Sequence, residues 1–208
     1  MKTISTQDLN NLQLQTLLQT AIAPRPIALA STIDKEGNIN LSPFSFFNLF
    51  SSNPPVVIFS PARRVRDNTT KHTLENVLEI PEVVIGIVNY KIVQQISLAS
   101  TEYSKAENEF IKSGLTMKDA DLIQPKLIDE CPVNLECKVL EVKPLGTEGG
   151  AGNLVICEII KIHVQEEYLN EEGNLDQIKL DLVARLGGNW YSRNNAENLF
   201  EVPKPLVT

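Results

Sequence analysis

Two long strand-like stretches joined by a glycine-rich loop constrain the fold of this 208-residue chain more than any other feature. The stretches cover residues 133–142 and 153–164, and the loop covers residues 146–152. From Val133 to Val139 apolar and polar residues alternate strictly, which is the pattern of a strand with one buried face. A loop with four glycines suits a hairpin turn. The pattern therefore predicts a long antiparallel hairpin.

The other predicted elements are short, and helices lie between and around the strands instead of alternating with them. That order argues against the βαβ units of a doubly wound sheet. Several short strands joined by tight turns are typical of a closed or nearly closed antiparallel barrel. With no internal repeat and no linker, residues 1–208 are expected to form a single domain. The predicted strands are 27–33, 39–41, 56–59 and 83–88; the predicted helices begin at Ser5, Leu74 and Lys91, and residues 101–130 are expected to form short helices and loop.

The acidic charge balance narrows the range of partners. The chain has 19 basic and 26 acidic residues, which gives a formal net charge of −7. Nucleic-acid binding through counterion release needs a basic face, and anionic membranes attract basic segments, so neither is expected as a partner. Apolar runs such as residues 83–88 are too short to span a bilayer, and the polar N-terminus lacks a signal peptide. We therefore expect a cytoplasmic protein.

The three cysteines and two histidines predict neither a disulfide framework nor a metal site. An odd number of cysteines in a cytoplasmic chain argues against disulfides, and no Cys-x-x-Cys pair occurs. His72 and His163 lie far apart in the sequence, so a zinc site lacks ligands. Cys137 and Cys157 fall in apolar strand patterns, where a thiol is expected to be unreactive.

A phenylalanine-rich segment is the first candidate for function. Phe44, Phe46, Phe47 and Phe50 are interleaved with serines over a strand and loop. So many large rings on both sides of one segment cannot all enter one core. Some of them are therefore expected to face a flat ligand or a second subunit, which predicts a homodimer.

A basic segment, residues 63–73, is the second candidate. It holds Arg63, Arg64, Arg66 and Lys71 in a chain that is acidic overall. Thr70 or Thr73 is expected to cap the helix that follows, and a helix N-terminus beside basic and hydroxyl groups is suited to bind an anion. A solvated basic loop is the alternative interpretation, and the segment alone leaves both open.

The remaining motifs are expected to have structural roles. Residues 183–191 contain two glycines followed by Trp190 and Tyr191, and we interpret them as a helix end with a glycine cap and core aromatics. The glycines of residues 146–152 do not fit the spacing of a nucleotide-binding loop. Acidic pairs such as Glu166-Glu167 lie in turn-like surroundings and indicate no acid–base site. A bound cofactor that performs the chemistry itself would explain this absence.

Taken in order, five segments resemble the flavin reductase-like, FMN-binding split-barrel family. They are residues 24–32, 37–48, 53–56, 71–76 and 185–191. The resemblance implies a mainly β fold, an antiparallel split β-barrel of Greek-key type with peripheral helices. It also implies a homodimer with non-covalent FMN near the subunit interface. The flavin would be reduced by NADH or NADPH and reoxidised by free flavin, oxygen, a metal or a partner oxygenase.

The resemblance also implies a set of cofactor-binding residues, without a catalytic side chain. The phosphate would be held by Ser31, Thr32, Lys71 and Thr73, and the isoalloxazine ring would be lined by residues 40–45. The family often has an aspartate where this chain has His72. The full set of cofactor-binding candidates is Ser31, Thr32, Asn40, Leu41, Ser42, Ser45, Phe46, Arg63, Lys71, Thr73, Arg185 and Trp190.

Two other functions remain open at this stage. One is an FMN-bearing electron-transfer protein without a nicotinamide site. The other is a flavin-free barrel whose phenylalanine patch binds another protein. The final electron acceptor, a small molecule or a partner oxygenase, and the choice between NADH and NADPH are not specified by the sequence.

Overall fold

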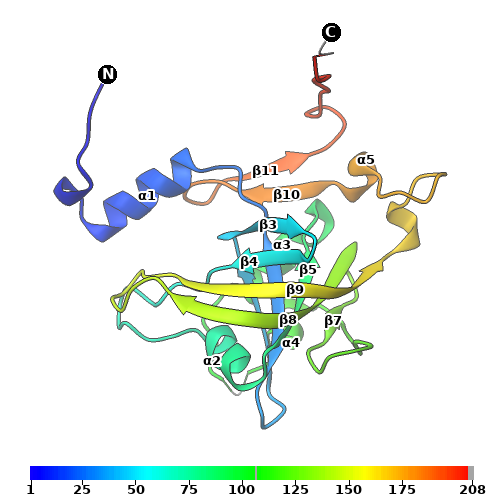
Figure 1. Ribbon diagram of the computed structural model, residues 1–208, viewed down its shortest axis with the longest axis horizontal. Helices are drawn as coiled ribbons and strands as arrows, with labels where there is room; N and C mark the ends of the chain where they lie inside the picture. The colour runs from blue at the N-terminus through cyan, green and yellow to red at the C-terminus, as the bar shows by residue number, and fades with distance from the viewer. Residues whose placement is uncertain (106, 206–208) are drawn as a thin grey trace.

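The computed structural model describes residues 1–105 and 107–205, and its main element is one seven-stranded antiparallel sheet (Figure 1). The strand order is β2-β1-β5-β8-β9-β4-β3. The predicted long hairpin is confirmed, because β8 pairs with β9 from Val133 opposite Val164 to Pro144 opposite Asn153. The strands are β1 (Ala28–Ile33), β2 (Ile39–Phe44), β3 (Phe47–Ser52), β4 (Pro55–Phe59), β5 (Glu82–Ile87), β8 (Val133–Pro144) and β9 (Asn153–Val164).

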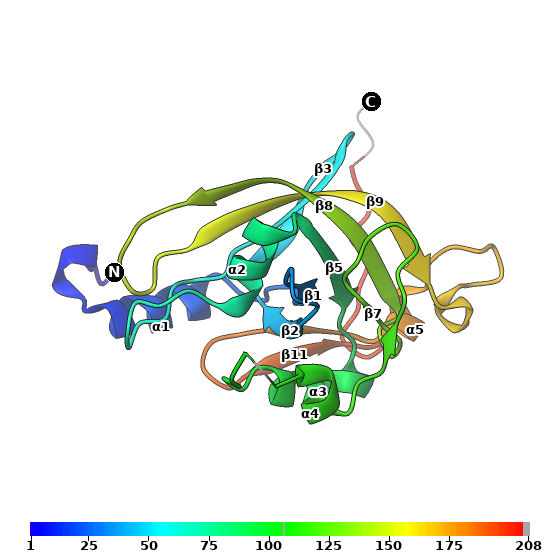
Figure 2. The same cartoon turned by 90° about the horizontal axis from the view of Figure 1, so that it is seen from below.

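The two edge strands of this sheet are consecutive in the chain. Strands β2 and β3 lie at opposite edges, yet only Ser45 and Phe46 separate them. The three Cα–Cα steps from Phe44 to Phe47 span at most about 11 Å, so the sheet must curl until its edges meet at this corner, and Figure 2 shows the curl. Among the described residues no ladder joins β2 to β3. The expectation of a mainly β, antiparallel fold with peripheral helices is confirmed.

Each face of the sheet carries its own apolar core, because side chains alternate along every strand. On one face Phe44 and Phe59 stack with ring centroids 5.4 Å apart, beneath Leu74 and Val77 of α2 (His72–Glu79). On the other face, α3 (Val93–Ala99) and α4 (Glu109–Ser113) cover a cluster that includes Leu29 and Phe110. Figure 2 shows these helices on the two sides of the β1–β2 hairpin.

Helix α1 (Asn11–Ala21) has no buried residue and extends away from the sheet (Figure 1). The sequence predicts a helix start at Ser5, but Ser5 caps only a short 3-10 turn, Thr6–Asp8. The helix itself begins after Asn10, because Asn10 and Gln13 form a reciprocal capping box, with bonds of 2.9 and 3.0 Å. The apolar face of α1 is therefore only partly covered by the described residues of this chain.

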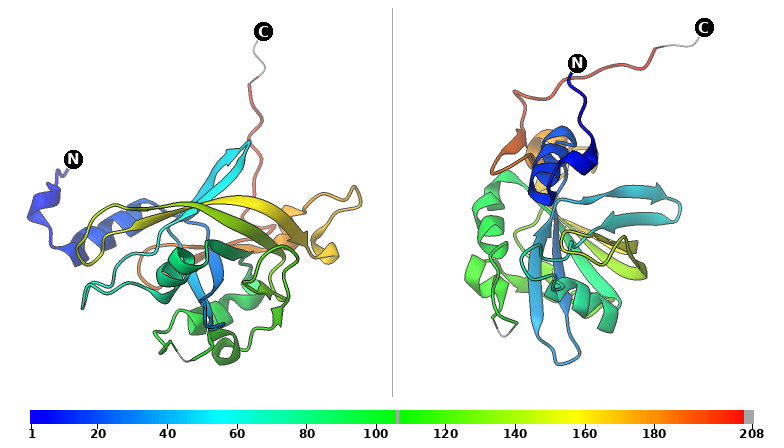
Figure 3. Two further views of the ribbon diagram at one scale, coloured as in Figure 1. Left: turned by 60° about the horizontal axis from the view of Figure 1, so that its bottom comes forward. Right: turned by 90° about the vertical axis from the view of Figure 1, so that its left-hand side faces the viewer.

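Residues 182–194 correct the sequence prediction, since they form a β-hairpin instead of a helix end. Strands β10 (Leu182–Arg185) and β11 (Tyr191–Asn194) pair antiparallel beside α1, as Figures 1 and 3 show. Gly188 has φ +58°, which suits glycine in a tight turn. A Cβ on Gly187 would lie 2.3 Å from Thr20 Oγ1, so only glycine lets the turn pack against α1.

The remaining elements connect these parts. No described helix is both long and apolar enough to cross a membrane. Residues 101–130 contain α4 and one short strand pair, close to the expected short helices and loop. The elements not yet named are the short strands β6 (Met117–Lys118) and β7 (Leu127–Ile128), the 3-10 turns Tyr90–Ile92 and Glu166–Tyr168, and α5 (Gln177–Leu180).

The turn between β1 and β2 is organised by Asp34. Its buried carboxylate accepts hydrogen bonds from the N–H groups of Glu36 (3.0 Å) and Asn38 (2.8 Å) and from Asn38 Nδ2 (2.9 Å). Lys105 Nζ lies 3.1 Å from it. Burial alone would raise the pKa of Asp34, but the bonds from Asn38, Lys105 and Glu36 lower it to about 2.

This shift predicts a specific loss of stability in acid. Because the folded pKa is about 2 and the ordinary value 3.8, the contribution is present above about pH 4 and is lost as the pH falls toward about 2. Over that range wild type should lose about 2 kcal/mol more unfolding free energy than Asp34→Asn. Urea unfolding at several pH values measures this, with Asp8→Asn on the exposed N-terminal turn as the control. Parallel curves for wild type and Asp34→Asn would contradict the assignment.

The three cysteines are predicted to be unreactive in the native protein. Cys131, Cys137 and Cys157 are all buried and free. Burial raises the pKa of the Cys137 thiol to about 12 and raises the pKa of the other two as well. A thiol reagent at about pH 8 should label none of them in native buffer and all three in denaturant. Rapid labelling of the native protein would show that a core strand opens.

Candidate functional site

The predicted site residues fall into three groups, of which the first is a buried polar network behind α2. The Asn40 amide and the Thr73 hydroxyl are hydrogen-bonded at 2.8 Å, and Asn76 Nδ2 donates to Thr32 Oγ1 at 3.1 Å. The Leu41 N–H donates to Glu109 Oε2 at 3.1 Å. These bonds attach α2 and α4 to β1 and β2.

The network also protects the edge of the sheet. β2 pairs only with β1, so the outward backbone groups of β2 would be free to pair with another chain. The outward N–H of Leu41 is taken by Glu109, and Pro43, two residues on, has no N–H to donate. Burial raises the pKa of Glu109, which has no ion-pair partner among the described residues.

The expectation that Ser31 and Thr32 hold a phosphate stays a prediction. The two residues are neighbours on β1, and neighbouring strand residues point to opposite faces of a sheet, so their hydroxyls face different sides of β1. Both side chains are fully buried in β1. Thr32 bonds to Asn76, while Ser31 Oγ has no hydrogen-bond partner. Their adjacency in the sequence does not show whether the two side chains point to the same face of the strand.

The second group is the basic segment, residues 63–73, which is folded into a compact loop. Arg63 is used inside the loop, because its Nε donates to Asn68 Oδ1 (2.6 Å) and its Nη2 to Asn68 O (2.5 Å). Arg64 Nη1 donates to the Thr69 hydroxyl (3.1 Å) and to the Thr70 carbonyl. The hairpin loop after β8 packs against this segment, since a Cβ on Gly149 would lie 3.0 Å from Val65 Cα.

Lys71 stands at the N-terminus of α2 as a partly buried cation. Lys71 is the N-cap residue of α2, and its side chain accepts no hydrogen bond from the N–H groups in the first turn of the helix. Burial lowers the pKa of Lys71, and repulsion from Arg64 lowers it further. Glu102 pairs with Arg64 (3.4 Å) and Arg66 (2.5 Å), whereas Lys71 has no ion pair among the described residues.

Two details of this segment correct the sequence prediction. Neither Thr70 nor Thr73 caps α2: the Thr70 hydroxyl donates to Glu75 Oε1 at 2.5 Å, and Thr73 is buried against Asn40. Burial lowers the pKa of His72, so this residue is neutral near pH 7 and adds no charge. The cations beside the helix start are therefore Lys71 and Arg64.

The third group surrounds the corner where the chain passes from β2 to β3. An apolar groove of about 550 Å³ lies between α1, residues 146–151 and Phe46. A smaller cavity of about 130 Å³ lies on the side of Ser45, Arg185 and Tyr191. The groove also reaches Ala62 and Val65, and so connects the corner with the basic segment.

Arg25 is a buried side chain that contacts this corner through Ser45. Its side chain is only 7% exposed, and its Nε is 3.4 Å from Ser45 Oγ. Nη1 donates to the carbonyls of Gln19 (2.5 Å) and Ile22 (2.7 Å) at the end of α1, and Nη2 donates to Leu186 O (2.9 Å). One guanidinium thus fixes α1, the β10–β11 turn and the corner together.

The β10–β11 turn supplies the outer residues of the third group. Arg185 donates from Nη2 to Gly188 O (2.6 Å), and its guanidinium lies 4.5 Å from the centre of the Tyr191 ring. Trp190, at the tip of the turn, is 76% exposed and makes no contact with either cavity. The structure therefore brings Arg185 and Ser45 together and leaves Trp190 outside.

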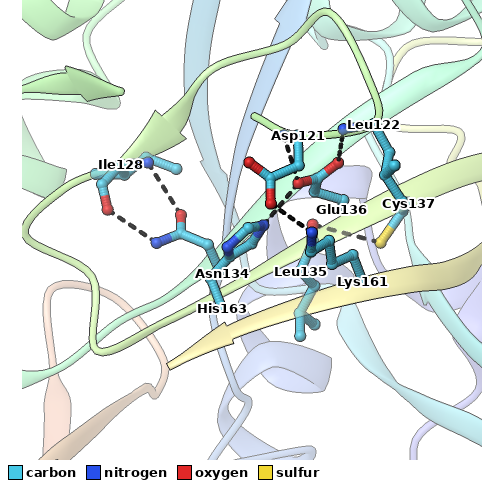
Figure 4. Close-up of polar contacts among 9 residues, drawn as sticks. All are labelled: Asp121, Leu122, Ile128, Asn134, Leu135, Glu136, Cys137, Lys161 and His163. Atoms are coloured by element: carbon cyan, nitrogen blue, oxygen red, sulfur yellow. Dashed lines mark hydrogen bonds and ion pairs between the residues drawn. The ribbon is translucent and has the colours of Figure 1, made fainter. Parts of the chain in front are cut away.

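One further cluster resembles a metal site but is already satisfied. Asp121, Glu136 and His163 place ligand atoms within 4.8 Å of one another (Figure 4). Glu136 is fully buried and accepts from the N–H groups of Asp121 (2.9 Å) and Leu122 (2.8 Å). His163 Nε2 lies 2.6 Å from Glu136, and Lys161 pairs with Asp121. The ammonium group of Lys161 therefore already places a positive charge beside the cluster (Figure 4).

These contacts make the cluster a clamp for the loop before β7. Burial alone would raise the pKa of Glu136, but bonds from the Asp121 and Leu122 N–H groups and from His163 lower it. A carboxylate with this many donors is a stable anion, and it holds residues 121–122 against β8 and β9.

The arrangement fits a planar ligand that carries one phosphate. Lys71, Arg64 and the start of α2 offer charge and N–H donors to an anion. The corner offers apolar cavities bordered by the hydroxyl of Ser45 and the ring of Phe46. The sequence predicted residues 187–191 near the site and named Arg64 within the basic segment, but it did not single out Arg25 or Arg64 as a site residue.

Comparisons with known proteins agree with this fold. A family model for the flavin reductase like domain matches residues 20–179. An uncharacterized protein of Aquifex aeolicus (strain VF5) is 35% identical over 170 residues, which are 82% of this chain and 84% of that protein.

Two solved structures are similar over almost the whole chain. Nitrilotriacetate monooxygenase component B from Bacillus cereus has a TM-score of 0.89 at 28% identity, covering 97% of this chain and 98% of its own. The 2-nitrobenzoate 2-nitroreductase of Pseudomonas fluorescens has a TM-score of 0.84 at 26% identity, covering 100% and 99%. The predicted resemblance is confirmed, and the chain belongs to the family of proteins with a flavin reductase-like domain.

Proposed function

We propose that this protein binds FMN non-covalently and transfers hydride from NADH or NADPH to the bound flavin. The observation that carries the proposal is Lys71, a partly buried cation at the start of α2 that forms no ion pair with any described residue. A cation in that state gains most from a bound anion. The apolar groove that runs from the neighbouring Val65 to Phe46 has room for a flat ring.

In this proposal the residues bind and orient while the cofactor supplies the redox chemistry. FMN, when bound, provides the hydride-accepting ring. Lys71 and Arg64 hold the phosphate through charge-assisted hydrogen bonds. Ser42, Ser45 and Phe46 border the ring, and the bond from Arg25 keeps Ser45 in place. The apolar walls of the groove exclude water from the ring.

Other predicted site residues are given supporting roles. Asn40 and Thr73 join β2 to α2, Leu41 joins β2 to α4, and Arg63 shapes the basic loop. Ser31 and Thr32 are not assigned to the phosphate, because both are buried in β1. Trp190 remains a predicted neighbour of the ring, in a position where a second subunit would have to complete the contact.

We also propose that residues 1–208 form a single domain of split-barrel type that works as a homodimer. The meeting of the two sheet edges at Ser45–Phe46 supports the split barrel. Leu49 and Phe50 on the edge strand β3 are 60% and 64% exposed, and α1 buries none of its residues. Exposed apolar surface of this extent is typical of subunit interfaces.

Two classes of electron acceptor are proposed to reoxidise the flavin. The similarity to component B of a monooxygenase supports a partner oxygenase, and the similarity to a nitroreductase supports a small-molecule acceptor. An electron carrier without a nicotinamide site remains the alternative function. Rapid bleaching of the bound flavin by NADH or NADPH under anaerobic conditions would favour the reductase.

The phosphate assignment predicts that Lys71→Ala weakens FMN and spares riboflavin, which has the same ring and no phosphate. Loss of one charge-assisted contact should lower FMN affinity by roughly 10- to 100-fold. Added salt should narrow the difference between wild type and variant. Titration of both ligands, followed by flavin fluorescence, measures the effect.

A control for the loss of charge is Lys204→Ala, on the exposed segment that follows β11 and outside both cavities. It should bind both ligands as wild type does. If Lys71→Ala weakens the binding of FMN and riboflavin equally, the role of Lys71 lies in the ring pocket or in the fold and not at the phosphate. Unchanged binding of both would make the basic segment a solvated loop.

If the protein is a dimer, its mass in solution should depend on concentration, and a charge introduced on the apolar edge should weaken the association. Phe50→Asp should shift the protein toward monomer, because it places a carboxylate on an apolar edge. Sedimentation velocity measures this at micromolar concentration, with Asp8→Asn as a surface control and circular dichroism as the check of folding. A wild-type protein that stays monomeric would refute the dimer.

A further inference from the structure

The small cavity at the corner differs in character from the groove beside it. It measures about 130 Å³, well below the roughly 300 Å³ at which pockets for drug-sized ligands begin. Ile27, Pro43 and Ile96 form apolar walls, and Ser45, Arg185 and Tyr191 form the polar side. The space suits one small planar molecule with a single polar end.

The charge around this cavity is positive and uncompensated. No carboxylate lines the cavity in the part of the chain that the structure describes. Within that same part neither Arg185 nor Arg25 forms an ion pair, and both guanidinium groups rely on carbonyl oxygens and on the Tyr191 ring. Burial lowers the pKa of Arg25, and repulsion from Arg185 lowers it further.

The neighbouring cavity on the same hairpin shows the contrast. It is lined by Arg193, Tyr90 and residues of α3, and it also touches Tyr191. There Arg193 is already neutralised, since Nε and Nη2 each lie 2.7 Å from the Asp181 carboxylate. A free anion is therefore attracted to Arg185 and not to Arg193.

We propose that this cavity binds the carboxylate of a small aromatic molecule, as a second ligand beside the flavin. Arg185 would receive the carboxylate, and the Ser45 hydroxyl would donate to it. The ring would lie against Ile27, Pro43 and Tyr191. The cofactor's own phosphate is assigned to Lys71, which leaves Arg185 without a cofactor charge to balance. That a flavin lies beside this ligand rests on the proposed function, whereas the binding of the carboxylate to Arg185 does not.

Benzoate and benzamide test the proposal, because they share a ring and differ in charge. Calorimetry at low ionic strength, on FMN-loaded and on flavin-free protein, should show benzoate binding at least about tenfold more tightly than benzamide. Arg185→Gln should abolish the preference and Arg185→Lys should keep part of it. The backbone pairing of Arg185 with Arg25 does not depend on the side chain, so both variants should fold.

The control is Lys204→Gln, which removes one exposed charge from a residue that lines neither cavity and should leave the preference intact. Equal affinities for benzoate and benzamide in wild type would overturn the proposal, as would a preference that survives in Arg185→Gln. A weaker affinity for NADPH in Arg185→Gln with unchanged benzoate binding would instead assign Arg185 to a dinucleotide phosphate, which also overturns it.

The two forms of the protein separate this proposal from the proposed function. If FMN fails to bind but flavin-free protein still prefers benzoate, the flavin function is wrong and the carboxylate site stands. If FMN binds with the selectivity expected for Lys71 but benzoate and benzamide bind alike, only the carboxylate site is wrong.

Discussion

The hydrogen bonds of the Arg25 guanidinium hold together the region on which the candidate site depends. Four separate segments meet there: the end of α1, the passage from β2 to β3, the start of β1 and the β10–β11 turn. Because Ser45 and Phe46 carry the chain from one sheet edge to the other, any displacement of this corner would separate the edges. A buried guanidinium with five N–H donors is suited to fix several carbonyl groups at once.

The distribution of charge is the basis for proposing two anion sites in an acidic protein. Carboxylates on this chain are largely engaged: Asp34 with its own turn, Glu136 with a loop, and Glu102 with two arginines. Lys71 and Arg185 lack such partners within the described residues. A chain with a net charge of −7 therefore holds two cations, Lys71 and Arg185, that no described carboxylate neutralises through an ion pair.

Local patterns in the sequence predicted the parts of the fold whose cause is local. The alternation around Cys137 predicted the β8–β9 hairpin, since a strand with one buried face needs that period. The β10–β11 hairpin was mistaken for a helix end because its turn is fixed by contact with Thr20, which is distant in sequence. The candidate site divides in the same way: the charge run pointed to Lys71, but the partners of Arg63 and Thr73 depend on the folded chain.

The visible absorption spectrum of the purified protein tests the central claim most directly. Protein mixed with excess FMN and then desalted should remain yellow, with about one flavin per chain and a band shape perturbed by an apolar environment. Riboflavin under the same treatment should be retained less well, because it lacks the phosphate that Lys71 is proposed to hold. A folded sample that emerges colourless would contradict the flavin site and leave the apolar groove without its proposed occupant.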